Sequence, residues 1–329
     1  MRAWRVHRHG EPADVLSLDE VPDPAPRPGQ LVVEVEASAL GFPDVLLCRG
    51  QYQRRPDLPF ILGGEVAGRV SAVGDGVRLR VGDRVAALPH SGLAERVVVR
   101  EVGAFDLAGL DLDWAQAAAL PAAYQTAYAA LHLRARVQPG ETVLVHAGAG
   151  AVGSATIQLA VAAGARVLAT AGSDDKLTRC LEAGAELAVN NRADDVVAAV
   201  KEAAGGRGVD VVVDPVGGPV FTDSLRCLAF DGRLVAVGFS SGEQPACPVN
   251  RVLIKNVSVL GLHWGLYATE RPDLVREVHQ RLRELAERGA VRPLIFGEYP
   301  MAAVPALLQK VAAGQTWGRV VVRPKAVSG

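Results

Sequence analysis

The segment ETVLVHAGAGAVGS, residues 141–154, constrains the fold of this chain more than any other. It runs from a β-branched stretch through the glycine pattern G-x-G-x-x-G into an apolar stretch, which is typical of a strand, a tight turn and a helix. At such a junction the first glycine permits the turn, the second lets the backbone approach a pyrophosphate, and the third lets helix and strand pack closely. The N–H groups of the first helical turn attract phosphate. The pattern therefore predicts a dinucleotide-binding loop formed by Gly148, Gly150, Ala151, Val152 and Gly153.

The rest of this region alternates between apolar runs of strand character and helical segments. We predict strands at 141–146, 166–171, 187–190, 209–214, 232–238 and 256–262, with helices between them. Such alternation forms βαβ units, and their right-handed crossovers lead to a doubly wound parallel sheet.

The first third of the chain has a different pattern. In residues 1–120, glycine and proline separate short alternating strands, which predicts a mostly antiparallel β-barrel. The parallel sheet is complete by residue 262, so the strand-like segment 314–324 is expected to return to the first domain. We therefore expect an α/β protein with a catalytic β-barrel domain at 1–120, to which 263–329 returns, and a dinucleotide-binding Rossmann domain at 121–262.

Composition argues against several classes of function. The chain has 35 Lys and Arg against 36 Asp and Glu, so no basic excess points to nucleic acid. No apolar run has the length of a membrane span and the N-terminus lacks the apolar region of a signal peptide, so we expect a cytoplasmic protein without membrane contact. The four cysteines and seven histidines show no metal-binding spacing, and we expect no metal.

The end of the second predicted strand indicates which dinucleotide binds. NAD-binding sheets place an acidic residue there for the ribose 2′-hydroxyl, whereas this strand ends at Ala171 or Gly172. The missing carboxylate leaves room for a 2′-phosphate and favours NADPH. We interpret Asp174 and Asp175 as the N-cap and first-turn residues of the next helix. The residues expected at the 2′-phosphate are Gly172, Ser173, Lys176 and Arg192.

Segments spread over nearly the whole chain carry a family resemblance. They are FPDVLLCRGQY (42–52), LPFILGGEVAGRVSAVGDGV (58–77), VGDRV (81–85), LPAAYQTAYAAL (120–131), VHAGAGAVGSATIQLA (145–160) and DPVGG (214–218). Together they resemble the medium-chain dehydrogenase/reductase superfamily, and more closely its zinc-free quinone oxidoreductase, or ζ-crystallin-like, family. The resemblance implies a GroES-like β-barrel domain beside a Rossmann domain.

Zinc-dependent members of this superfamily have ligand positions that the chain lacks. Gly41 stands where the resemblance places a ligand cysteine, and the histidine of the second ligand region is missing from Gly63-Gly64-Glu65. Residues 86–115 contain no cysteine for a structural zinc lobe. The resemblance therefore implies an enzyme that works without zinc.

The resemblance also implies roles for single residues. Tyr52 would lie near the substrate, either as a hydrogen-bond or proton donor or as an amphipathic wall residue that takes no part in the chemistry. Asp44 would anchor backbone or ribose, with helix capping as the alternative, and Thr126 would approach the nicotinamide, with helix packing as the alternative. Arg319 would lie close to the cofactor cleft, with a structural salt bridge as the alternative. Further cofactor-binding candidates at the strand ends are Val216, Gly217, Phe239 and Ser240.

These observations lead us to expect an NADPH-dependent, zinc-independent reductase that transfers hydride to quinones or similar conjugated carbonyls. One alternative is reduction of the C=C bond of an enoyl thioester or enone, for which Arg49, Arg54 and Arg55 could form a basic patch. Another is a crystallin-like or RNA-binding protein that uses the same fold. The segment 256–264 is expected to form the contact of a homodimer.

Overall fold

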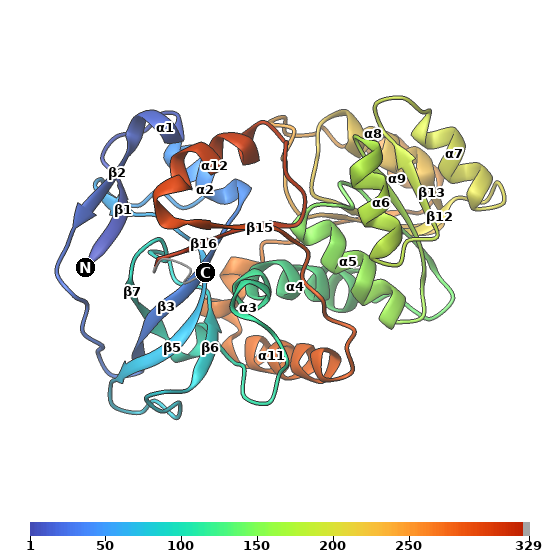
Figure 1. The fold of residues 1–329 in the computed structure, drawn as a ribbon. Coiled ribbons are helices and arrows are strands. Elements are labelled where there is room, and N and C mark those ends of the chain that lie inside the picture. Colours follow the sequence, from blue (N-terminus) through green and yellow to red (C-terminus); the bar gives the residue numbers. More distant parts are fainter. Residues whose placement is uncertain (325–329) are drawn as a thin grey trace. The chain divides into compact units, whose positions relative to one another are not determined.

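The computed structural model describes residues 1–324. The chain folds into two compact units (Figure 1). Unit 1 consists of Met1–Ala122 and the chain from Pro293 onward, and unit 2 consists of Ala123–Arg292. Unit 1 has two sheets and unit 2 has one, and each unit has its own hydrophobic core.

Unit 2 is built on a single parallel sheet. Its strands are β9 (Thr142–Val145), β10 (Arg166–Ala171), β11 (Leu187–Asn190), β12 (Val209–Asp214), β13 (Leu228–Ala236) and β14 (Ser258–Gly261). They are ordered β11-β10-β9-β12-β13-β14, and every neighbouring pair is parallel. This is the doubly wound order, with the strand of the glycine motif next to the point where the order reverses. The predicted Rossmann sheet is confirmed.

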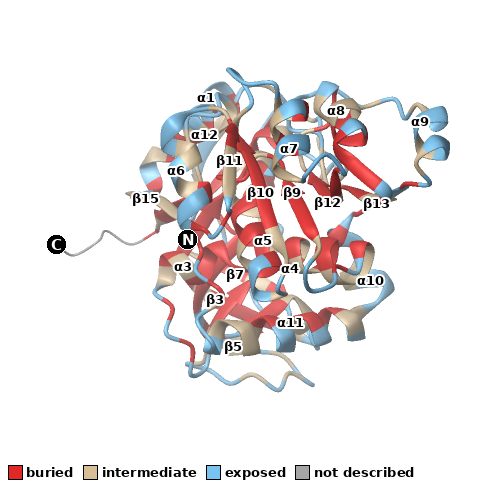
Figure 2. Ribbon diagram, turned by 90° about the vertical axis from the view of Figure 1, so that its right-hand side faces the viewer, coloured by how far each residue is buried: buried red, intermediate tan, exposed pale blue. Residues whose placement is uncertain are grey.

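The helices of unit 2 follow the strands as the alternating pattern predicts. They are α4 (Pro121–Tyr128), the π-helix η2 (Ala129–Ala135), α5 (Ala151–Ala162), α6 (Asp174–Glu182), α7 (Val196–Ala203), α8 (Pro219–Cys227), α9 (Val249–Ile254), η3 (Trp264–Leu266), α10 (Tyr267–Glu270) and α11 (Pro272–Glu287). Strands β9, β10 and β12 are buried almost throughout (Figure 2). Val197 and Val200 of α7 and Phe221 and Leu225 of α8 pack against the apolar side chains of this sheet.

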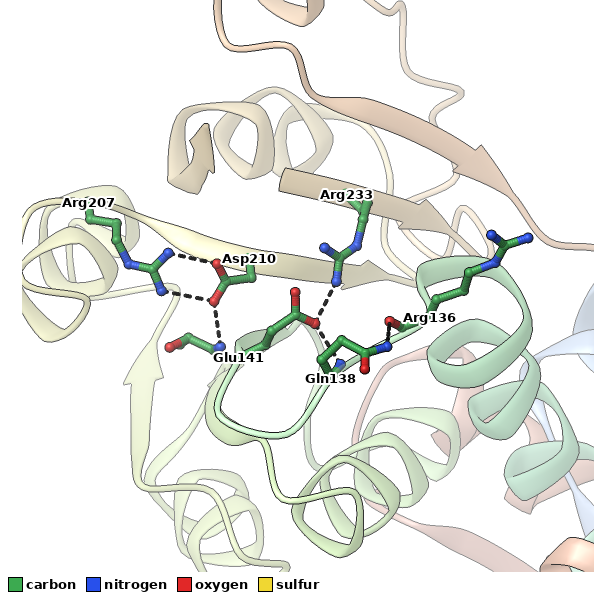
Figure 3. Close-up of polar contacts among 7 residues, drawn as sticks. Arg136, Gln138, Glu141, Arg207, Asp210 and Arg233 are labelled. Carbon is green, nitrogen blue, oxygen red and sulfur yellow. Dashed lines mark hydrogen bonds and ion pairs between the residues drawn. The ribbon is translucent and has the colours of Figure 1, made fainter. Parts of the chain in front are cut away.

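Charged side chains tie together the amino-terminal ends of three neighbouring strands (Figure 3). Asp210 accepts two hydrogen bonds from Arg207, at 2.7 and 3.0 Å, and a third from the backbone N–H of Thr142 at 2.7 Å. Arg233 donates to Glu141 at 2.6 Å. These bonds hold β9, β12 and β13 in register at the edge opposite to the glycine loop.

Unit 1 contains two sheets. The smaller is β2-β1-β4, from β1 (Arg2–Val6), β2 (Leu16–Glu20) and β4 (Phe60–Ile61). The larger is ordered β15-β16-β3-β5-β6-β8, with β7 also paired to β3, and all its pairs except β15–β16 are antiparallel. Its strands are β3 (Gln30–Leu40), β5 (Glu65–Val73), β6 (Arg84–Ala87), β7 (Arg96–Arg100), β8 (Ala104–Asp106), β15 (Ile295–Pro300) and β16 (Arg319–Arg323). The expected mostly antiparallel sheet and the returning last strand are both present.

Short helices complete unit 1. They are α1 (Pro12–Val15), α2 (Phe42–Cys48), η1 (Glu101–Gly103), α3 (Trp114–Ala119), η4 (Met301–Ala303) and α12 (Val304–Ala312). Helix α12 packs on α1 and α2, and the indole of Trp4 donates to the backbone oxygen of Met301 at 2.8 Å. The segment after residue 293 is thereby part of the core of unit 1.

The boundary between the units differs from the expected one for residues 263–292. They were expected to return to the first domain, but they belong to unit 2. The physical reason is a buried hydrogen-bonded chain. Gln125 of α4 accepts from the indole of Trp264 at 2.8 Å and donates to His279 of α11, also at 2.8 Å. The final residues of the expected returning segment, 325–329, lie outside the described part of the chain.

Within residues 1–324, no helix is both long enough and apolar enough to cross a membrane.

Candidate active site

The glycine loop joins β9 to α5 at the carboxyl edge of the sheet in unit 2. Gly150 is the N-cap of α5, and the first-turn N–H groups of a helix have no partner within it. A Cβ on Gly153 would collide with the backbone oxygen of Ala147, which confirms the close packing expected there. Gly148 differs from expectation, because Ala147 takes the left-handed conformation, with φ of 49°. Gly148 is needed for space instead, since a Cβ there would lie 2.8 Å from Cys180 Sγ.

The end of β10 brings together the four residues expected at a 2′-phosphate. Ser173 is the N-cap of α6, and its side chain makes no capping hydrogen bond. A Cβ on Gly172 would lie 3.0 Å from Arg192 Nε, so the guanidinium group of Arg192 rests against this glycine. Partial burial lowers the pKa of Lys176, and the positive charge of Arg192 lowers it further. Asp174 and Asp175 both lie in the first turn of α6, so neither is the N-cap that we expected.

Two loops meet at the ends of β12 and β13 in the same sheet. Gly217 has φ of 70°, and a Cβ there would lie 2.6 Å from the ring of Phe239. The backbone N–H of Ser240 donates to the oxygen of Pro215 at 3.1 Å. These contacts place the predicted residues Val216, Gly217, Phe239 and Ser240 next to one another.

Asp214, which the sequence analysis did not select, holds this arrangement. Its carboxylate is 1% exposed and accepts from the backbone N–H groups of Val216 at 2.7 Å and Gly217 at 3.0 Å. The D-P-V-G-G sequence contains the signal for this turn, because aspartate commonly accepts from the backbone two residues on.

His146 at the end of β9 is a packed residue. It is 3% exposed and lies 3.0 Å from Thr170 Oγ1 and 2.9 Å from Ser224 Oγ. Ser224 donates its proton to the oxygen of Val220, so it must accept from His146 Nε2–H, and Thr170 then donates to Nδ1. Burial lowers the pKa of His146, in agreement with this neutral form.

Thr126 is a partly buried residue of α4, for which no side-chain hydrogen bond is seen. Its neighbour Gln125 is the buried centre of the bonds to Trp264 and His279 described above. Since the Gln125 amide must donate to His279, the histidine nitrogen accepts and the ring is neutral. Burial lowers the pKa of His279 to about 4.

Asp44 occupies the third position of α2 in unit 1 and caps this helix. Its carboxylate accepts from the backbone N–H of Gly41 at 2.9 Å, and its own N–H donates to the Gly41 oxygen at 3.0 Å. It is 4% exposed, and burial raises its pKa to about 6. The capping alternative is therefore present in the structure.

Arg319 of β16 forms a buried ion pair with Glu65 of β5. Glu65 also accepts from the backbone N–H of Ala122 at 3.0 Å, and burial raises the pKa of Glu65 to about 7. The guanidinium group lies against Gly41, where any Cβ would collide with Nη1. The structure thus contains the salt-bridge alternative for Arg319, and it explains why position 41 is glycine.

The surroundings of Gly41 do not fit a zinc ion. The position expected for a ligand side chain is filled by the cationic group of Arg319, which would repel a second cation. Among residues 1–324, no group of three or more His, Cys, Asp or Glu side chains is arranged to bind a metal.

Tyr52 lies after α2 and packs against the core of unit 1. Burial raises the pKa of its hydroxyl, and the negative charge of Asp44 raises it further, so the phenol keeps its proton at neutral pH. Burial likewise lowers the pKa of Arg54, which is close enough to interact with Tyr52 and Asp44. Arg49 is bound by Glu11 at 2.8 and 2.9 Å, which leaves Arg54 and Arg55 of the suggested basic patch.

Comparisons with known proteins agree with this geometry. The alcohol dehydrogenase GroES-like domain model matches residues 27–127, and the zinc-binding dehydrogenase model matches residues 151–281. Quinone oxidoreductase-like protein 2 of Bos taurus is 38% identical over 328 residues, covering 98% of this chain and 93% of the relative. The structure of Escherichia coli quinone oxidoreductase complexed with NADPH is 30% identical, with a TM-score of 0.90 and coverage of 98% and 100%. That of CurK enoyl reductase is 28% identical, with a TM-score of 0.89 and coverage of 98% of each chain.

Both family models match in the expected order, and the similarity to the bovine relative extends over nearly all of both chains. The strand order of unit 2 and the antiparallel sheet of unit 1 agree with that relationship. The chain is an oxidoreductase of the medium-chain dehydrogenase/reductase superfamily and belongs to its quinone oxidoreductase-like family.

Proposed function

We propose that this protein is an NADPH-dependent reductase that transfers hydride to quinones or similar conjugated carbonyls without the help of a metal. The observation that carries the choice of cofactor is the pair of cations at the end of β10. Burial lowers the pKa of Lys176, and the positive charge of Arg192 lowers it further, so an anionic 2′-phosphate bound between them would favour both charges. Gly172 and Ser173 beside them add space and a hydroxyl donor.

The remaining cofactor contacts come from the glycine loop and the two loops at the strand ends. The N–H groups of Ala151, Val152 and Gly153 would bind the pyrophosphate, and the turn held by Asp214 would orient the nicotinamide. NADPH supplies a hydride from C4 of its nicotinamide ring when bound. The E. coli relative, whose structure was solved with NADPH, supports the same assignment.

Tyr52 is the residue that would donate a hydrogen bond and a proton to the substrate. A conjugated carbonyl that receives hydride gains negative charge on oxygen, and a protonated phenol can donate a hydrogen bond to that oxygen and then a proton. Arg54 beside Tyr52 adds a positive charge that favours the same oxyanion. We assign no zinc, because Arg319 fills the space beside Gly41.

A steady-state assay with NADPH and two substrate panels tests the reaction. We expect turnover of benzoquinones and naphthoquinones, and a fall in kcat of about tenfold in Tyr52→Phe, since one hydrogen bond to charge contributes about 1.5 kcal/mol. Exhaustive chelation should leave the rate unchanged. Turnover that is absent without added zinc, or equal in Tyr52→Phe and the parent, would contradict the proposal.

Reduction of an enoyl C=C bond is the second candidate, and the similarity to CurK enoyl reductase favours it specifically. Acyl-CoA recognition would need cations, of which Arg54 interacts with Tyr52 and Arg55 is the exposed residue that follows it in the sequence. A higher kcat/KM for crotonyl-CoA than for any quinone would replace the leading proposal with this one.

We also propose that the protein forms a homodimer through β14. This strand is the last in the sheet of unit 2, and its outer edge pairs with no strand of the described chain. Apolar side chains are exposed nearby, among them Val259 at 37% and Leu266 at 54%. Light scattering should give a dimer mass for the parent and a monomer mass for Val259→Pro, which cannot donate to a partner strand. A monomeric parent would contradict this assignment.

A further inference from the structure

Unit 2 contains a pocket of about 190 Å³ that the proposed reaction does not use. One wall comes from the end of α5, namely Leu159, Ala162 and Ala163. The glycine loop lies at the other end of this 12-residue helix, and a helix rises 1.5 Å per residue. The pocket therefore lies at the opposite end of α5, more than about 12 Å from the expected pyrophosphate site.

A second part of the pocket lining is a pair of aromatic rings, one of which belongs to a π-helix. Tyr128 ends α4 and His132 lies one turn later in the π-helix η2, with ring centroids 4.4 Å apart and planes inclined by 44°. π-Helical turns are rare and are found frequently at functional sites. The wider turn brings both rings to the same face, where they line the pocket.

Both ring groups are uncharged at neutral pH. Burial lowers the pKa of His132, so the imidazole is neutral, and burial raises the pKa of Tyr128, so the phenol keeps its proton. Two flat, neutral, polarisable rings with hydrogen-bonding edges form a surface that suits another aromatic ring.

The third wall is α11, and it carries charge. Arg281, Glu284 and Arg288 line the pocket, and Arg281 pairs with Glu284 at 3.2 Å. Of the charged groups that line it, two are cations and one is an anion; Glu284 interacts with both arginines, and the negative charge of Glu277 also acts on Tyr128. Arg288, at the end of α11, is exposed and can reach an anionic group at the pocket mouth.

The volume limits the size of the ligand. A protein cavity of about 150 Å³ accommodates benzene, so about 190 Å³ suits one aromatic ring with a small substituent. We propose that the pocket formed by α4, η2, α5 and α11 binds a small monocyclic aromatic carboxylate, with the ring against Tyr128 and His132 and the carboxylate at Arg288. This site is independent of the NADPH site, and the proposal does not rest on the proposed reaction.

The probe is 4-fluorobenzoate, observed by ¹⁹F NMR line broadening on the full chain. We expect a Kd of about 1 mM, the affinity typical of a ligand of this small size. Saturating NADPH should leave this Kd within about twofold. The neutral analogue 4-fluorobenzyl alcohol should bind about tenfold more weakly, since it lacks the charge.

Two variants test the geometry. Ala162→Phe places a ring in the pocket from an exposed helix position and should abolish binding, and Arg288→Gln should weaken it about tenfold. Arg276→Gln is the matched control, because Arg276 is an exposed arginine of α11 that pairs with Asp273 and does not line the pocket. It should bind as the parent does, and each variant should keep the melting temperature of the parent within about 2 °C.

Several results would overturn the proposal. They are absence of broadening up to 10-fold above the expected Kd, displacement of the probe by NADPH, equal binding of the neutral alcohol, or unchanged binding in well-folded Ala162→Phe. Loss of quinone reductase activity would not bear on it, so the two proposals fail separately.

Discussion

The two units place their ionisable groups in contrasting ways. Unit 1 encloses three charged side chains, Asp44, Glu65 and Arg319, all at most 8% exposed, and burial raises the pKa of both carboxyl groups. Unit 2 buries the carboxylate of Asp214 against backbone N–H groups, keeps His146 and His279 neutral, and places Lys176 and Arg192 toward the surface. Arg319 and Glu65 of unit 1 form a buried ion pair, whereas Lys176 and Arg192 of unit 2 lie beside each other at the end of β10. We therefore expect substitutions in the first group to affect folding and those in the second to affect binding.

The largest expected effect is on the buried ion pair. Arg319→Met removes the cation and leaves Glu65 buried without its partner, so the free energy of unfolding should fall by about 3 kcal/mol or more. Arg323→Met is the matched control on the same strand, because its 2.6 Å pair with Glu298 is partly exposed and should contribute at most about 1 kcal/mol. Urea denaturation measures both. Equal losses in the two variants would show that burial does not set the contribution of the Arg319–Glu65 pair.

The next effect is a dependence on pH that originates in unit 1. The folded-state pKa of Asp44 is about 6, above its ordinary value of 3.8, so folding favours the protonated form. Its contribution is complete below pH 3.8 and is lost as the pH rises through 6, a decrease of about 2 to 3 kcal/mol. Asp44→Asn should reduce the parent's loss of stability between pH 4 and 7 by this amount, as measured by urea denaturation, while Glu65 continues to contribute in the same range. The exposed control Asp75→Asn should follow the parent, and a parent-like curve for Asp44→Asn would refute the assignment.

Unit 2 should contribute a pH dependence of the opposite sign, in which stability falls as the pH is lowered. The folded-state pKa of His279 is about 4, below its ordinary value of 6.5, so the unfolded chain takes up the proton more readily. Stability from this group is present above pH 6.5 and decreases by about 2 kcal/mol by pH 5. His279→Gln should lack this acid-induced loss, while the exposed control His263→Gln should retain it. Thermal unfolding at several pH values between 5 and 7 distinguishes the two, and identical profiles would show that His279 is not the responsible group.

The sequence predicted the fold of unit 2 well because each of its signals is local. The apolar runs of β9 to β14, the glycine pattern and the missing acid after β10 all lie within a few residues of the feature they report. Contacts between residues far apart in the sequence could not be predicted in this way. Nothing near Arg319 indicates that it pairs with Glu65, 254 positions away, and nothing near Gln125 indicates His279.

Two local signals have a role that differs from the expected one. In the D-P-V-G-G turn we expected Val216 and Gly217 to matter, whereas the carboxylate of Asp214 holds both of them in place. The glycine of the tight turn, Gly148, serves close packing, because the preceding Ala147 adopts the left-handed conformation. Both cases depend on which atoms come close in space, and residue types alone do not specify that.

The central claim is that the cations at the end of β10 select NADPH, and a fluorescence titration of the reduced cofactors tests it most directly. We predict that the parent binds NADPH at least about 100-fold more tightly than NADH, since two charge-assisted contacts contribute about 3 kcal/mol. In the double variant Lys176→Ala/Arg192→Ala, NADPH should weaken to the level of NADH, and NADH should be unchanged. Equal affinities of the parent for the two cofactors, or tighter binding of NADH, would contradict the account.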